Sequence, residues 1–162
     1  MKKKIKIILA VAIIVAMPFI VFACYYIWPL LETPFYDIEE WDDFKKTTLN
    51  EYSQIENVSI GSYRTFLNLT YRLNEKVDID TINEIFESGK EYIMQENVFE
   101  TIKNAHIRNH NNHFGEILIE FRNPDKEIIC QFEGRLGSVG TPNEDKVSEW
   151  SFHLRKKDYF LE

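Results

Sequence analysis

The feature that most constrains this chain is a run of 22 residues without a charged side chain, at positions 7–28. As an α-helix such a run spans about 33 Å at about 1.5 Å per residue, enough to cross a hydrocarbon core of about 30 Å. A helix is required there because lipid offers no partners to unpaired backbone groups. Tyr25, Tyr26 and Trp28 match the aromatic belt of a membrane interface. The sequence therefore predicts one transmembrane helix over residues 7–28.

The charges on either side of this run predict its orientation. Lys2, Lys3, Lys4 and Lys6 precede it, whereas acidic residues follow it. Lysine-rich flanks stay in the cytoplasm, so the N-terminus is expected there and the rest of the chain outside. We therefore expect a cell-membrane anchor over residues 1–31 and one extracytoplasmic domain over residues 32–162, which is a length that suits a single domain.

An alternative for the same segment is a signal peptide. Small or modest residues at Val21 and Ala23 have the offsets of a cleavage site before Cys24. The stretch Val-Phe-Ala-Cys resembles a bacterial lipobox, although Phe22 is bulky for its middle position. Lipidation of Cys24 is therefore a second hypothesis and a secreted form is a third. All three place residues 32–162 outside the cytoplasm.

The exported part is strongly acidic. Without the four N-terminal lysines the chain has 15 basic and 26 acidic residues, a net charge of −11. Such a field repels polyanions, so nucleic acid is not expected as a partner. We expect contacts with the membrane through residues 7–28 and with a protein or peptide partner. Cys130 lies in an apolar strand pattern and is expected to be a core residue without a disulfide partner in this domain.

The pattern of the exported part predicts a helix and then a hairpin. Asp37 and Glu40 have the spacing of a capping box, and apolar residues recur from there to position 52 at helical intervals. Gly61 and Ser62 suit a two-residue turn. After it, strict alternation over residues 67–74 predicts a strand with one buried face and one wet face.

The remainder predicts a main helix and a meander. A helix capped by Asp80 or Thr81 carries an apolar stripe for about 27 residues, with a break expected near residues 95–97. Strands follow at residues 116–122, 127–133 and 147–156. The fold class is therefore α+β, with a five-stranded antiparallel sheet packed on one main helix. This hairpin–helix–meander order resembles the PAS-like modules of bacterial extracytoplasmic sensors, with cystatin-like and ferredoxin-like folds as alternatives.

Three of the four histidines form the most chemical-looking cluster. On a helix His106 and His110 lie one turn apart, so they could share a metal ion with His113 or Glu116. The cluster lacks the glutamate of H-E-x-x-H, so the general base of that metalloprotease motif is missing. Metal binding, or a hydrolase built on it, is therefore an alternative hypothesis.

A second group consists of Gly134, Gly137 and Gly140, in an expected connection between two strands. A phosphate-binding loop would need a strand leading into a helix, which this context does not offer. A partner-binding loop is the functional hypothesis for these glycines.

The leading functional hypothesis is a bacterial, membrane-tethered, extracytoplasmic binding or accessory protein that is not an enzyme and needs no cofactor. The serines lie outside any G-x-S-x-G context, and neighbouring acids such as Asp42 and Asp43 do not face each other across a cleft. The rivals are the metal-dependent protein described above and an immunity-type lipoprotein whose acidic surface neutralises a basic peptide.

Overall fold

We describe the protein from a computed structural model. The structure describes residues 16–19, 21–22, 33–34, 41–63, 65–110, 113–137, 140 and 146–161, with the side chains of residues 33, 34, 109 and 110 excepted. Contacts within the chain gather into two units, residues 1–32 and residues 33–162.

The described residues of the first unit, 16–19 and 21–22, are helical. Over the described residues, the structure contains no helix with the length and hydropathy needed to cross a bilayer. Most of the predicted span lies outside the described residues, as does Cys24, so the anchor and its lipidation stay predictions.

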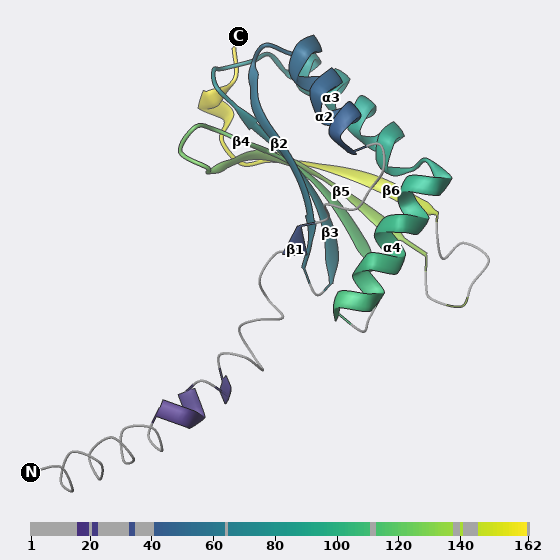
Figure 1. Ribbon diagram of the computed structural model, residues 1–162. Coiled ribbons are helices and arrows are strands. Elements are labelled where there is room, and N and C mark those ends of the chain that lie inside the picture. Colours follow the sequence, from purple (N-terminus) through teal and green to yellow (C-terminus); the bar gives the residue numbers. More distant parts are fainter. Residues whose placement is uncertain are drawn as a thin grey trace, which may run out of the picture. The chain divides into compact units, whose positions relative to one another are not determined.

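The second unit is an α+β domain, as predicted, and its strands follow chain order across one sheet (Figure 1). The strands are β1 (Thr33–Pro34), β2 (Ile55–Ser62), β3 (Phe66–Leu73), β4 (Glu116–Arg122), β5 (Ile128–Leu136) and β6 (Val147–Leu154). The helices are α2 (Trp41–Glu51), α3 (Ile79–Ile93), α4 (Glu96–His110) and the short 3-10 helix η3 (Lys157–Tyr159).

The sheet is mixed, so the prediction of an antiparallel sheet was wrong at one pairing. β3 and β4 run parallel, with Leu69 opposite Ile119 and Tyr71 opposite Phe121. The other pairings are antiparallel. Parallel neighbours need a crossover of a dozen or more residues, usually helical, and α3 and α4 supply it. The crossover returns the chain to the end of the sheet at which β3 began.

Helices α2, α3 and α4 lie on one face of the sheet, where a single main helix was predicted (Figure 1). The expected break near residues 95–97 is confirmed, because α3 ends at Ile93 and α4 begins at Glu96. The N-cap of α3 is Asp78, whose carboxylate accepts a hydrogen bond from the Thr81 N–H at 2.7 Å, so the predicted caps at Asp80 or Thr81 were wrong. This bond holds the pKa of Asp78 below its ordinary value.

The turn of the first hairpin also differs from its prediction. Gly61 and Ser62 belong to β2, where Ser62 lies opposite Leu67, and the chain reverses after them. The Tyr63 N–H donates to the Phe66 carbonyl at 2.9 Å to close that reversal. Gly61 is an interior strand residue because β1 pairs with it on its other side, through Pro34.

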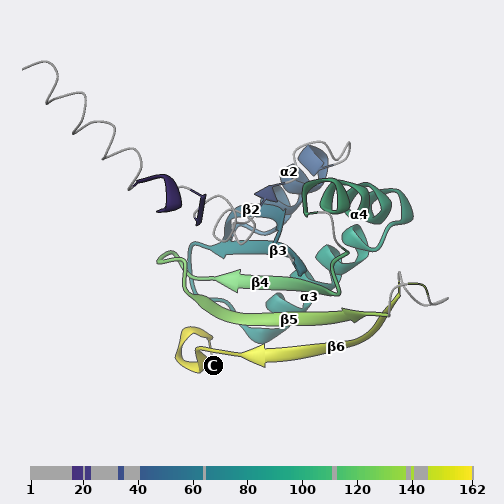
Figure 2. The same ribbon diagram turned by 90° about the horizontal axis from the view of Figure 1, so that it is seen from below.

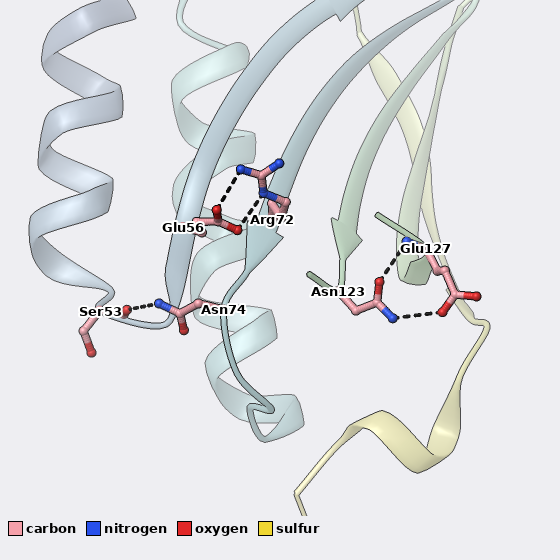
Figure 3. Close-up of polar contacts among 6 residues, drawn as sticks. All are labelled: Ser53, Glu56, Arg72, Asn74, Asn123 and Glu127. Carbon is pink, nitrogen blue, oxygen red and sulfur yellow. Dashed lines mark hydrogen bonds and ion pairs between the residues drawn. The ribbon is translucent and has the colours of Figure 1, made fainter. Parts of the chain in front are cut away.

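The hairpin between β4 and β5 has a short turn that begins at Asn123. The Asn123 side chain accepts from the Glu127 N–H at 2.8 Å and donates to the Glu127 carboxylate at 2.9 Å (Figure 3). Lys126 adopts a left-handed φ of 66° inside this turn. At the open end of the β2–β3 hairpin, the Asn74 side chain donates a hydrogen bond to the Ser53 carbonyl at 2.9 Å.

The core lies between the helices and the facing side of the sheet. The odd-numbered residues of β3, Leu67 to Leu73, are all 0% exposed, as their alternation predicts. Aromatic rings continue the packing, since Phe86 of α3 stacks on Phe132 of β5 with ring centroids 3.8 Å apart. On α2, Phe44 stacks on Tyr92 of α3 at 4.0 Å.

Gly89 sets the approach of α3 to the sheet. A Cβ at this position would lie 2.3 Å from the Tyr71 hydroxyl oxygen and 2.9 Å from a methyl of Leu69. The Tyr71 hydroxyl is buried and has no hydrogen-bond partner among the residues described. Burial raises the pKa of Tyr71 above its ordinary value.

Gly89→Ala is expected to destabilise the domain by about 1–3 kcal/mol, because steric overlap outweighs the gain of about 1 kcal/mol in helix propensity. Urea unfolding measures it. Gly115→Ala is the control, since a Cβ there meets nothing within 4 Å. Adding Tyr71→Phe removes the nearest clashing atom and should recover part of the loss. If Gly89→Ala and Gly115→Ala lowered the free energy of unfolding equally, close packing of Gly89 against Tyr71 would be contradicted.

Candidate functional site

The sheet has a second face, turned away from α3, which we call the polar face (Figure 2). Among the described elements no helix covers it. Alternation in the strands assigns side chains to it from the register of the sheet. From β3 to β6 they are Asn68, Thr70, Arg72, Glu116, Leu118, Glu120, Arg122, Gln131, Glu133, Arg135, Glu149, Ser151 and His153.

The centre of the polar face is enclosed, so the prediction that this side of β3 is wet was wrong there. Asn68 is 0% exposed, and Thr70, Glu120 and Gln131 are also buried. The physical reason is position, because β3 and β4 are central strands with side chains on both flanks. Neither polar atom of the Asn68 side chain has a hydrogen-bond partner among the residues that the structure describes. An unsatisfied buried amide costs about 1–3 kcal/mol.

Ion pairs balance the charges on this face. The Arg122 guanidinium donates to Glu120 at 2.6 Å and 3.0 Å, and Arg135 donates to Glu133 at 3.1 Å. Near the end of the β2–β3 hairpin, Arg72 pairs with Glu56 at 2.7 Å (Figure 3). Carboxylates and guanidinium groups therefore alternate here, and the net negative charge of the chain is not concentrated on this face.

A shallow hollow of about 630 Å³ lies where β3 and β4 begin and β5 ends. Thr65, His113, Gly115, Glu116, Arg135 and Leu136 line it. Two backbone hydrogen bonds fix these segments together, from the Gly115 N–H to the Thr65 carbonyl at 3.1 Å and from the Leu136 N–H to the Gly115 carbonyl at 3.0 Å. Three chain segments that are far apart in sequence thus meet at one place.

The hollow presents groups of opposite charge side by side. Glu116 lies directly opposite Arg135 in the β4–β5 ladder, and both side chains belong to the polar face. The Arg135 side chain is 71% exposed, so its guanidinium can still donate hydrogen bonds to a carboxylate of a ligand. Glu116 offers an acceptor for an ammonium group, while Thr65 and His113 add hydrogen-bonding capacity. This set complements a small zwitterion.

The predicted histidine cluster is divided by the structure. His106 is 0% exposed and its ring meets Phe114 edge-on, with centroids 5.0 Å apart. His113 lines the hollow beside Glu116, and His110 ends α4 with a side chain outside the described residues. Across the described residues, no three side chains of the metal-binding types gather as a site. Because His110 is not covered, metal binding stays a prediction.

The three glycines occupy different environments. Gly134 lies in β5 opposite Trp150, although a loop was predicted from this residue onward. A Cβ on Gly134 would lie 2.9 Å from the Trp150 ring, so this glycine makes room for the indole. Gly137 follows β5 and donates to the Lys146 carbonyl at 3.2 Å, and Gly140 is exposed with a φ of 81°. Their role in binding a partner stays a prediction.

Cys130 is a core residue, as its strand pattern predicts. It is 0% exposed and free, and burial raises the pKa of its thiol to about 12. At neutral pH the thiol is therefore protonated and a weak nucleophile.

A second hollow, of about 800 Å³, lies under the C-terminal tail. The Lys76 ammonium donates to the Asp158 carbonyl at 2.7 Å, and the Leu161 N–H donates to the Val77 carbonyl at 3.1 Å. These bonds fasten the tail to the connection between β3 and α3. The hollow is lined by Lys76, Ile79, Leu154, Lys157, Asp158, Phe160 and Leu161.

The residues of the first hollow could be found in the sequence only in part. The sequence predicts His113 or Glu116 as a further ligand beside His106 and His110, and the structure brings His113 and Glu116 to one hollow. The sequence does not predict Thr65 as a site residue, because its approach to Glu116 depends on the parallel pairing of β3 with β4. Arg135 reaches Glu116 through the antiparallel β4–β5 ladder. The pattern Gly134-Arg135-Leu136-Gly137 also suggested a loop, which hid the strand position of Arg135.

A scan against protein-family models finds no match to this chain, and searches of curated proteins and of solved structures find no significant match either.

Asn68→Leu is expected to raise the free energy of unfolding by about 1 kcal/mol, because it removes an unsatisfied buried amide at similar volume. Urea unfolding at neutral pH measures this change. Asn57→Leu is the control, since Asn57 is a partly exposed residue of β2 and should give no gain. A clear loss of stability in Asn68→Leu would show that the amide has bonding partners after all.

Proposed function

We propose that this chain is a membrane-tethered, extracytoplasmic binding protein without a catalytic role. The 22 uncharged residues at positions 7–28, preceded by four lysines, support the tether and its orientation. The acidic surplus of residues 32–162 supports a protein that does not bind nucleic acid or other polyanions. The hairpin–helix–meander order, which resembles PAS-like sensor modules, is consistent with a ligand-binding role.

The ligand that we propose is a small zwitterion bound in the hollow at residues 65, 113, 115–116 and 135–136. One observation carries this proposal, namely that Glu116 and the exposed Arg135 lie side by side at the rim of the polar face. A carboxylate on the ligand would pair with Arg135, and an ammonium group would pair with Glu116. A free dipeptide carries these two groups at its ends and serves as the probe.

Dialanine at about ten times its Kd is expected to stabilise the full-length chain in detergent by about 1.4 kcal/mol. A millimolar Kd is expected for so small a ligand. Arg135→Gln should weaken binding at least about tenfold, because a hydrogen bond to a charged group is lost. Thermal unfolding against dialanine concentration measures both effects.

Two controls accompany this measurement. Arg155→Gln removes a guanidinium beyond the end of β6, outside the residues that line the hollow, and should leave binding unchanged. N-acetyl-dialanine amide lacks both terminal charges and should not stabilise the chain. Equal stabilisation by the free and blocked dipeptides, or unchanged binding in Arg135→Gln, would reject this ligand class.

The proposed topology makes a separate prediction. A protease added to intact cells should degrade residues 33–162, because the domain lies outside the membrane. Immunoblotting with an antibody against the domain measures its loss, and a cytoplasmic protein in the same cells serves as the control for lysis. Protection of the domain until the cells are lysed would rule out an extracytoplasmic location.

A further inference from the structure

Among the described elements, no strand pairs with the outer edge of β6. Among the described strands β6 pairs with β5 alone, and Figure 2 shows it as the outermost strand of the sheet. The opposite edge is different, because it ends in the two-residue strand β1, which contains Pro34. A short edge strand with proline resists further pairing, whereas the eight residues of β6 contain no proline and no lysine.

Apolar side chains lie along this open edge. Phe152 and Leu154 are each 44% exposed, although both point to the side of the sheet that faces the helices. Phe152 packs against Phe132 of β5, with ring centroids 4.9 Å apart, and the rest of its side chain is exposed to solvent. An exposed edge strand that carries large apolar residues is a site for the addition of another strand.

The register with β5 shows which backbone groups are available. The Arg155 N–H donates to the Ile129 carbonyl at 2.8 Å, so Arg155 directs its backbone groups toward β5. Hydrogen bonding alternates along an antiparallel ladder. Trp150, Phe152 and Leu154 therefore direct their N–H and C=O groups to the open edge.

These three residues match a second copy of the same strand. We consider two β6 strands that run antiparallel with Phe152 opposite Phe152. Trp150 then lies opposite Leu154, and all three residues of each strand that direct their backbone groups to the open edge have a partner. In this register Glu149 lies opposite Arg155 of the other copy, and this charge pair occurs twice because the arrangement has two-fold symmetry. Shifting the strands by two residues in either direction leaves one outward-facing residue of each strand unpaired and separates the charges.

We propose that two copies of this chain associate through β6, antiparallel and centred on Phe152, so that their two sheets become continuous. The interaction combines backbone hydrogen bonds, apolar contact among Trp150, Phe152 and Leu154, and the two Glu149–Arg155 charge pairs. It involves neither Arg135 nor Glu116, but Glu149 lies opposite Arg135 in the β5–β6 ladder. The Phe152→Cys cross-link leaves Glu149 unchanged and therefore tests the dimer separately from the proposed ligand site.

Cysteine cross-linking of the full-length chain in membranes tests the register. In a Cys24→Ser background, Phe152→Cys should form a disulfide-linked dimer, because hydrogen-bonded antiparallel pairs have Cα atoms about 5.5 Å apart, within the disulfide range of about 4.4–6.8 Å. Ser148→Cys is the matched control, since Ser148 is exposed on the same strand but lies far from the two-fold axis. Cross-linking at both positions, or at neither, would overturn the proposal.

A charge exchange tests the pairing without a cysteine. Glu149→Arg should weaken dimerisation of the full-length chain in detergent by about tenfold or more, because two attractive pairs become repulsive. The double variant Glu149→Arg with Arg155→Glu should restore it. Sedimentation velocity measures the monomer–dimer equilibrium, and unchanged circular dichroism confirms folding. A wild-type chain that stays monomeric, or a double variant no better than Glu149→Arg, would refute the β6 dimer.

Discussion

The domain depends on the parallel pairing of β3 with β4. Seven consecutive residue pairs join the first hairpin to the last three strands at this seam. Without it the hairpin and the meander would be two small sheets, each with an additional open edge. The pairing also places Tyr71 beside Phe121, with ring centroids 5.1 Å apart, in the layer that α3 covers. Helix α3 lies close to Tyr71 in that layer, and the absence of a side chain at Gly89 makes this close packing possible.

The pairing of β3 with β4 also determines which polar side chains are enclosed or brought together on the polar face. Because β3 and β4 are central, polar residues such as Asn68 and Glu120 are enclosed by neighbours on both sides. The crossover that makes the strands parallel also brings the segment before β4 back to the start of β3. Thr65, His113 and Glu116 therefore meet around one hollow, and Arg135 joins them from the end of β5. Ligand binding at this rim would use Arg135 of β5, whereas dimerisation would use β6, whose Glu149 lies opposite Arg135 on the same face.

Local pattern was sufficient for several parts of the fold. Alternation in β3 predicted its buried side, and the polar residues 95–97 predicted the break between α3 and α4. These features depend on residues that are close in the chain. Two of the wrong predictions, the two-residue turn at Gly61 and the loop at Gly134, concern residues whose pairing is decided by a distant strand.

The sequence by itself determined an α+β domain, most of its helices and strands, the buried side of β3, and the acidic charge of residues 32–162, but it did not predict the sixth strand, β1. Only the tertiary structure decided that β3 and β4 are parallel, that Asn68 is enclosed, and that Arg135 lies beside Glu116. The physical reason is that periodicity records which side of an element is buried, but not which strand lies next to it. Neighbouring strands are chosen by the packing of the whole domain, and both the hollow and the open edge depend on that choice.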